Sequence, residues 1–465
     1  MWSGKFTPYS TCTVKRLDPS SNSSFFKFAS RENTLSRDQL YIYWLVDHGT
    51  RGYIDMPHQK AYEFYVEEKS TLRVWSEYAK FLQDEWEEHL ARYPVLKKAA
   101  IEKAEKLAQS VRTGGGQDIL IKYSDFNQAA YEFCQFLFSP WAVIYCIEPE
   151  IHKKMPESID KIIALDEPIE YQKMKMELRG TSAKKLSEKY GWLNVYNPCD
   201  EPYSVKEFER MKAEFKEESL EAGIGKMREN GENFERLAGT IGDEALKRKV
   251  GIVHKYAYLK TERIDTWKRL MFLLRGFYAY IAEESGKISL KDSCNLSTSE
   301  AIGFLKEGKL PPSAELKLRS QNKALYYFYN KKIEVLYEWE EIQRIDKRLE
   351  SIRNFDEVKG MPACKGNVEG KARIIRHTDD LKKFREGEVF VAKYTFPSYT
   401  PYMAKSAAII TDDGGITSHA AIISREYGIP CVVGTKHATK IFRDGDFVSV
   451  DAYSGVVKRV GRAKS

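Results

Sequence analysis

The pattern of the sequence changes near Asp356, and this change is the strongest constraint on the fold. Before it, apolar residues recur every three or four positions, which is typical of helices that bury one face. After it, Gly360, Gly366 and Gly370 separate short runs rich in β-branched residues. We therefore predict a multidomain chain: a mainly α-helical amino-terminal region over residues 1–355, irregular over 1–50, followed by a small α/β domain over 356–462.

The helical region carries two clear apolar stripes, from Leu72 to Tyr93 and from Ile264 to Ile281. Pro94 follows the first stripe and is predicted to end its helix. A long charged helix is expected between Pro312 and about Arg353. The segment Tyr41 to Val46 fits either a strand or a buried helix.

Composition narrows the class of protein. The 74 Lys and Arg residues exceed the 67 Asp and Glu residues by only seven in a chain of 465, so we do not expect a nucleic-acid partner. The seven cysteines form no Cys-x-x-Cys pair, which argues against a disulfide framework and suits a reducing cytoplasm. The longest apolar stretch, Phe136 to Ile147, contains Ser139 and Pro140 and is shorter than the roughly 18 residues of a membrane span. We expect a cytoplasmic protein without a membrane partner.

The region after Asp356 reads as strands with one helix. The helix is predicted from about Ser418 to Tyr427, after the third strand. The predicted strands are Ala372 to Ile375, Val389 to Ala392, Ala407 to Thr411, Cys431 to Val433, Phe447 to Val450 and Val456 to Val460.

One motif in this region points to chemistry. Gly414 and Gly415 allow a tight turn and the close approach of a ligand, and Thr417 or Ser418 can cap the helix that follows. His419 is thereby placed in the first helical turn, where free N–H groups and the helix dipole favour a neutral imidazole and an attached anion. We predict that His419 attacks a phosphoryl group and becomes phosphohistidine. The alternative is that His419 only packs at a helix start.

The string Gly-Gly-Ile-Thr-Ser-His-Ala-Ala at 414–421 strongly resembles the phosphohistidine, or swivelling, domain of the phosphoenolpyruvate-utilising enzymes. The similarity extends over about a hundred residues and includes segments 366–375, 395–403, 407–413, 425–430 and 433–435. This resemblance implies a β/β/α swivelling fold with His419 as the phosphorylated residue. It also implies that Thr417 hydrogen-bonds the ring or the phosphate, with Gly414, Gly415 and Ser418 as phosphate-binding neighbours.

The resemblance further implies partners and cofactors. In this family the domain moves between a site that phosphorylates it and a site that uses the phosphoryl group. Neither a (β/α)8 barrel nor an ATP-grasp domain is recognisable before Asp356, and no Gly-x-x-x-x-Gly-Lys-Ser/Thr loop is present. We therefore expect ATP and Mg²⁺ at a donor site on a separate ATP-grasp subunit, and a small-molecule phosphoryl acceptor bound by the helical region. A non-catalytic docking protein and a complete enzyme with a hidden donor site are the alternatives.

Two arginines are possible accessory residues. Arg425 lies in the motif's helix. Arg263 lies in the segment 260–265, which resembles a charged helix of the family's helical domain and equally fits a solvated helix face. His48 and His58 lack a third ligand at metal spacing, so no metal site is predicted, and His254 is expected at the surface.

Overall fold

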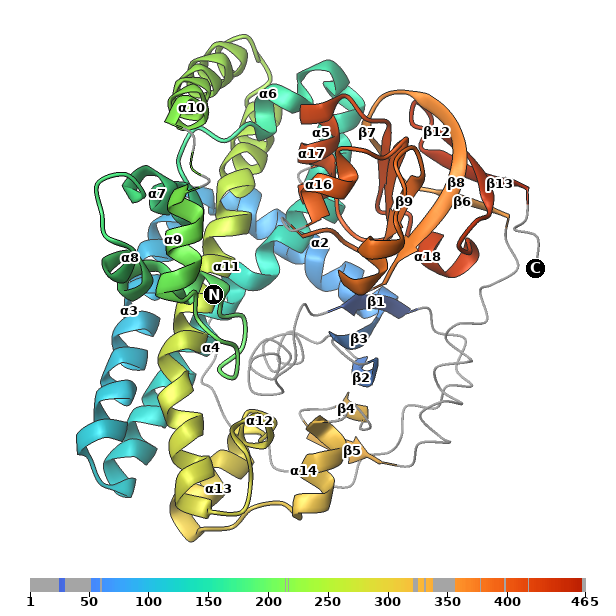
Figure 1. Ribbon diagram of the computed structural model, residues 1–465. Helices are drawn as coiled ribbons and strands as arrows, with labels where there is room; N and C mark the ends of the chain where they lie inside the picture. The colour runs from blue at the N-terminus through green and yellow to red at the C-terminus, as the bar shows by residue number, and fades with distance from the viewer. Residues whose placement is uncertain are drawn as a thin grey trace. The chain divides into compact units, whose positions relative to one another are not determined.

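The computed structural model describes residues 25–29, 52–58, 61–213, 215, 217–320, 325–329, 332–337, 356–376, 378–396, 399–416 and 418–461 (Figure 1). The chain forms two compact units, Met1–Val143 with Asp160–Ile342 and Ile144–Ile159 with Gln343–Ser465. The second unit therefore includes a segment taken from the middle of the predicted helical region. Tyr41 to Val46 and His48 lie outside the described residues.

Long helices dominate the first unit, as predicted. The longest is α11 (Glu244–Ser285), which packs on α3 (Trp86–Thr113) and α4 (Gly116–Ala142). Tyr123 of α4 stacks on Phe277 of α11 with ring centroids 4.2 Å apart. The other helices of this unit are α2 (Glu68–Asp84), α6 (Ile159–Ile163, whose first residue belongs to the second unit), α7 (Glu170–Glu177), α8 (Ala183–Tyr190), η3 (Gly191–Asn194), α9 (Val205–Ala213), α10 (Glu217–Gly239), α12 (Leu290–Ser293), α13 (Thr298–Glu307) and α14 (Ser313–Ser320).

Pro94 does not end its helix, contrary to the prediction. The break lies at Glu85, between α2 and α3, and Pro94 is inside α3. Proline removes one backbone hydrogen bond, but the buried face of α3 continues on both sides of it through Tyr93 and Ala100. Tertiary packing of that face therefore outweighs the local preference.

The first unit also contains a sheet that the sequence did not predict. Its strands are antiparallel in the order β1-β3-β2-β4-β5. They comprise β1 (Phe25–Ala29), β2 (Gly52–His58), β3 (Ala61–Glu67), β4 (Leu325–Tyr329) and β5 (Lys332–Leu336). The predicted long charged helix is wrong for β4 and β5, where an aromatic run and an alternating run favour strands over the helical preference of their charged neighbours.

The second unit is built on an eight-stranded mixed sheet, in the order β6-β13-β12-β8-β9-β10-β11-β7. Strands β8 to β11 run parallel and the remaining pairs are antiparallel. The elements are η1 (Val143–Ile147, whose first residue belongs to the first unit), α5 (Glu148–Lys154), η2 (Pro156–Ser158), β6 (Glu357–Lys359), β7 (Met361–Cys364), β8 (Asn367–Ile375), η4 (Thr378–Lys383), β9 (Val389–Ala392), α16 (Thr400–Met403), β10 (Ala408–Thr411), α17 (His419–Tyr427), β11 (Cys431–Val433), α18 (Ala438–Ile441), β12 (Phe447–Asp451) and β13 (Val456–Gly461).

The predicted strands and the helix of this small α/β domain are thus confirmed. Every residue of β9, β10 and β11 is buried, so both faces of the central strands are covered. Helix α17 contacts β7, β10 and β11, and its Ala420 and Ala421 belong to one of the two buried clusters that flank the sheet. The core therefore fixes the helix that carries His419.

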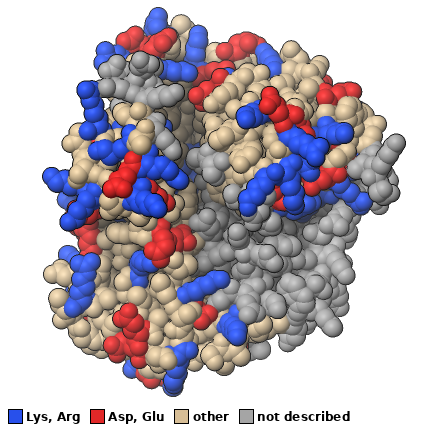
Figure 2. Space-filling view, viewed as in Figure 1, with Lys and Arg blue, Asp and Glu red and all other residues tan. Residues whose placement is uncertain are grey.

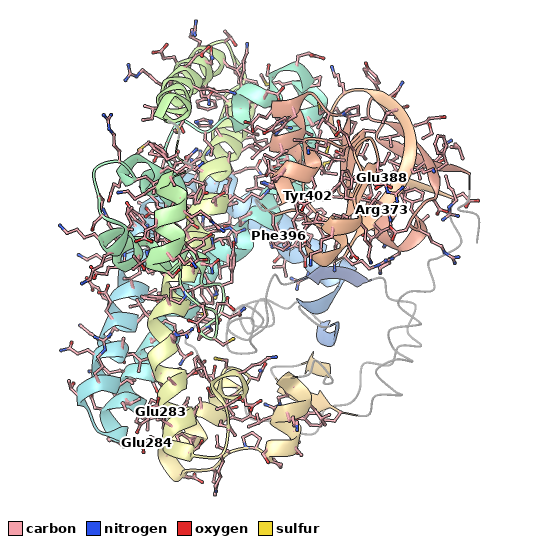
Figure 3. The ribbon with its side chains drawn as sticks, viewed as in Figure 1. Glu283, Glu284, Arg373, Glu388, Phe396 and Tyr402 are labelled. Carbon is pink, nitrogen blue, oxygen red and sulfur yellow. The ribbon has the colours of Figure 1, made fainter. Side chains whose placement is uncertain are left out.

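An ion pair joins β8 to the residue that precedes β9. The guanidinium of Arg373 on β8 donates from Nε and Nη2 to the two carboxylate oxygens of Glu388, at 3.0 and 2.7 Å (Figure 3). Glu388 is buried, which acts to raise its pKa, but hydrogen bonds from Arg373 and from the Arg385 backbone N–H bring the pKa below the usual value. On the face shown in Figure 2, Lys and Arg side chains lie beside Asp and Glu on both units.

Candidate functional site

The end of β10 leads through a glycine turn into α17. Gly414 has a φ of 110°, and a Cβ built on it would lie 2.8 Å from the Cβ of Ser418, so the turn requires glycine. Ser418 caps the helix: its Oγ accepts a hydrogen bond from the backbone N–H of Ala421 at 3.3 Å. Gly428, in the left-handed conformation, ends the helix.

His419 is the first residue of α17, and two threonine hydroxyls hold its ring. Its Nδ1 lies 2.8 Å from Oγ1 of Thr395, and its Nε2 lies 3.4 Å from Oγ1 of Thr400. Thr395 follows β9 and is buried, whereas Thr400 opens α16. When Nδ1 donates its proton to Thr395, Nε2 presents a lone pair, which is the state that a nucleophilic imidazole requires.

The base of the glycine turn is held by Asp412. Its carboxylate is buried and accepts hydrogen bonds from the Thr435 hydroxyl at 3.1 Å and from the Thr439 backbone N–H at 3.2 Å. The Thr439 hydroxyl also donates to it. The turn is therefore fixed on the side of β10, independently of any ligand.

The predicted site residues are only partly brought together. Gly414, Gly415, Ser418 and His419 form one continuous turn and helix start, while Thr417 lies outside the described residues. Arg425 donates to the backbone oxygens of Ala363 and Ile416, at 3.0 and 2.7 Å. It thus ties the turn to β7.

Arg263 lies on α11 of the first unit, not on the unit that holds His419. It is 9% exposed, and its Nη1 donates to the backbone oxygen of Leu137 at 3.2 Å. Its neighbours Glu262 and Asp265 are 2% and 3% exposed. The interpretation of residues 260–265 as a solvated helix face is therefore wrong for these side chains.

Burial perturbs the two acidic residues of this helix. Desolvation, with a smaller contribution from the charge of Asp265, raises the pKa of Glu262 to about 7. Burial also raises the pKa of Asp265, although Lys268 opposes the shift. Lys97 contacts Oε1 of Glu262, and Lys268 lies 3.3 Å from Oδ1 of Asp265. Their second oxygens, Oε2 and Oδ2, are buried and make no hydrogen bond with any described residue.

Sequence reasoning missed the roles of Thr395 and Thr400. Both lie in the segment 395–403, which resembles the family, but the resemblance assigned no role to either hydroxyl. His254 was expected at the surface, yet it is 9% exposed, bonds the backbone oxygen of Ile162 through Nδ1 at 2.8 Å and stacks on Phe234. These contacts join residues that are distant in sequence, so no local sequence pattern predicts them.

No group of three or more His, Cys, Asp or Glu side chains among the described residues could hold a metal ion. Within the same ranges, no helix combines the length and apolar character needed to cross a membrane.

Comparison with known proteins identifies the second unit. Residues 384–455 match the sequence model of the family described as PEP-utilising enzyme, mobile domain. This part of the chain is a PEP-utilising enzyme mobile domain. The match supports the swivelling fold predicted from the residues around His419.

Relatives of the mobile domain occur in several larger proteins. The chain is 50% identical over 102 residues to a probable phosphoenolpyruvate synthase of Staphylothermus marinus, covering 22% of this chain and 12% of the relative. It is 48% identical over 101 residues to chondramide synthase cmdD of Chondromyces crocatus, covering 22% and 3%. It is also 48% identical over 104 residues to the uncharacterized phosphotransferase YvkC of Bacillus subtilis, covering 22% and 12%. The chain thus spans only a small part of the curated relatives that it matches.

Proposed function

We propose that this protein is a phosphotransferase component in which His419 carries a phosphoryl group between a donor and an acceptor. The observation that supports this most is the position of the His419 ring: Nδ1 lies 2.8 Å from the Thr395 hydroxyl, and Nε2 lies 3.4 Å from the Thr400 hydroxyl. The mobile-domain match supports the same chemistry. Nε2 is therefore assigned as the nucleophile.

The proposed relay has two balanced steps. In the first, the Nε2 lone pair attacks the terminal phosphorus of the donor, a P–N bond forms, and the bond from phosphorus to the leaving oxygen breaks. In the second, an acceptor hydroxyl attacks phosphorus, the P–N bond breaks, and the hydroxyl proton passes to a base. The positive end of α17 favours the phosphoryl group bound on the ring.

The donor in this proposal is ATP with Mg²⁺ on a separate ATP-grasp subunit. The described residues contain no group of three or more candidate metal ligands, and the proposal routes no step on this chain through the ion. The cytoplasm is the proposed location, because it supplies the nucleotide.

The acceptor is proposed to bind the helical unit. A cavity of about 770 Å³ opens near the ends of α11 and α13, and its lining includes Tyr280, Glu284, Lys287 and Phe304. Glu284 lies beside Glu283 on the last turns of α11 (Figure 3). A mixed apolar and charged lining suits a small molecule that carries both a hydrophobic body and polar groups.

Labelled ATP tests the proposal. The full chain is incubated with labelled ATP, Mg²⁺ and a candidate ATP-grasp protein, and the label is tested for acid lability. We expect acid-labile label on the wild type and on His437→Ala, and none on His419→Ala. Label that persists in His419→Ala would exclude His419 as the carrier. Label without the second protein would favour a donor site on this chain.

A second candidate is a non-catalytic docking protein that uses the mobile domain as a binding module. It is supported by similarities that extend over roughly a hundred residues within proteins of different names. This candidate predicts no phosphohistidine with any donor and full function in His419→Ala.

A further inference from the structure

Residues 144–159 belong to the second unit although about two hundred residues separate them from its sheet. They comprise Ile144–Ile147 of η1, then α5 and η2. Two polar contacts attach this segment near β7. Nε2 of His152 lies 3.3 Å from the backbone oxygen of Pro362, and Nζ of Lys365 lies 2.6 Å from Oε1 of Glu157.

The same segment covers the glycine turn before His419. A Cβ built on Gly415 would lie 2.7 Å from Oε2 of Glu148 and 3.0 Å from Cγ2 of Ile144. Gly415 and Glu148 are both buried. The charge of Asp413 also adds to the effect of burial in raising the pKa of Tyr145, so these two side chains influence each other. The segment therefore packs directly against Gly415, in space that a larger side chain would contest.

The buried carboxylate of Glu148 lies beside Gly415, in the turn that leads into α17. The glycine turn ends at the amino terminus of α17. The partial positive charge of this terminus stabilises a nearby anion. A phosphoryl group on His419 adds roughly two negative charges at the same helix start. The carboxylate and the phosphoryl group then compete for one electropositive turn and repel each other in a site of low dielectric.

We propose that residues 144–159 are a cover that binds the glycine turn when His419 is unmodified and is released when His419 is phosphorylated. This rests on the proposed function only in taking His419 as the phosphorylated residue. Glu148 is the charge sensor of the cover, and Ile144 is its apolar contact. The cover exposes the turn after phosphorylation, when an acceptor site must reach it.

Phosphoramidate tests release without any protein donor. It transfers its phosphoryl group to an imidazole nitrogen: the P–N bond of the reagent breaks, ammonia leaves and the new P–Nε2 bond forms. The full chain is treated, its phosphorylation at His419 is measured by mass spectrometry, and amide hydrogen exchange is followed over residues 144–154. We expect exchange there to become at least about tenfold faster in the phosphorylated wild type.

Glu148→Gln provides the decisive comparison, because an amide has no charge to repel the phosphoryl group. We expect phosphorylation to change its exchange less than about threefold. Glu150→Gln is the matched control: Glu150 lies on the same helix, partly exposed and 3.0 Å from Lys154, and should behave as wild type. His419→Ala should not respond to the reagent.

Three results would overturn the proposal. They are unchanged exchange in phosphorylated wild type, an equal increase in Glu148→Gln, and failure of this small reagent to modify His419 at all. Because phosphoramidate replaces the enzymatic donor, the two proposals are tested separately. The release of the cover can be disproved while ATP still labels His419, and it can be confirmed when ATP does not label His419.

Discussion

Two pairs of buried carboxylates, one pair in each unit, have different surroundings. In the mobile-domain unit, which comprises residues 144–159 and 343–465, Asp412 and Asp446 accept hydrogen bonds from backbone N–H groups and from fixed side chains: Asp412 holds the glycine turn, and Asp446 binds the Arg443 N–H and Arg459. In the helical unit, Glu262 and Asp265 each keep a buried oxygen that bonds no described residue. The hydrogen bonds of Asp412 and Asp446 fix loop conformations, whereas the buried oxygens of Glu262 and Asp265 can bind a ligand or a proton.

The largest effect is predicted for the removal of Asp446, a buried carboxylate with hydrogen-bond partners. Asp446→Ala leaves Arg459 without the buried partner that its Nε contacts at 2.9 Å, and we expect a loss of about 3 kcal/mol in stability of this unit. Hydrogen exchange over β12 and β13 measures it. Asp356→Ala is the control, because Asp356 contacts the same guanidinium from an exposed position and should cost less than about 1 kcal/mol. Equal losses would contradict the distinction.

The next prediction tests the second pair of buried carboxylates. The pKa of Glu262 is raised from 4.5 to about 7, so the folded state binds more protons than the unfolded state between these values. Stability of the helical unit should therefore fall as pH rises through this window, by about 2 kcal/mol. Glu262→Gln should make the profile shallower, as measured by thermal unfolding at pH 5 and pH 8; the raised pKa of Asp265 leaves a residual slope. Glu105→Gln, which removes a half-exposed partner of Arg269, should leave the profile unchanged.

A smaller effect is expected where a polar contact orients the reacting ring. Thr395→Val removes the hydroxyl 2.8 Å from Nδ1 of His419 and should slow phosphorylation by phosphoramidate about tenfold. Thr400→Val, which removes a contact of 3.4 Å, should slow it less. The reverse order would show that Thr400, not Thr395, positions the ring.

The smallest predicted effect compares one helix cap in each unit. Ser418 and Ser182 accept backbone hydrogen bonds of 3.3 Å at the starts of α17 and α8. Replacing either by Ala should cost about 1 kcal/mol, seen as faster amide exchange in that helix alone. Spread of the Ser182→Ala effect into the mobile-domain unit would show coupling that the caps do not predict.

Local chemistry explains what the sequence could predict. Val389 to Ala392 is an unbroken apolar strand, and the turn before His419 needs glycine at 414, so both are legible from a few neighbouring residues. The capping of α17 by Ser418 follows from the same kind of pattern. Much of the fold of the small domain could therefore be predicted from the sequence.

The errors have a different origin, since they concern contacts between distant segments. The ring of His419 is held by Thr395, and the cover reaches Gly415 from Glu148; neither pairing leaves a periodic trace in the sequence. Pro94 remains helical because a buried face overrides its local preference. Charged residues around β4 likewise concealed a strand that only sheet pairing reveals.

The placement of residues 144–159 also determines how many covalent links join the two units. While the cover is bound, the chain passes between the units three times, after Val143, after Ile159 and after Ile342. Release of the cover leaves only the last of these links. Phosphorylation of one ring would then reduce the number of chain crossings between the two units from three to one.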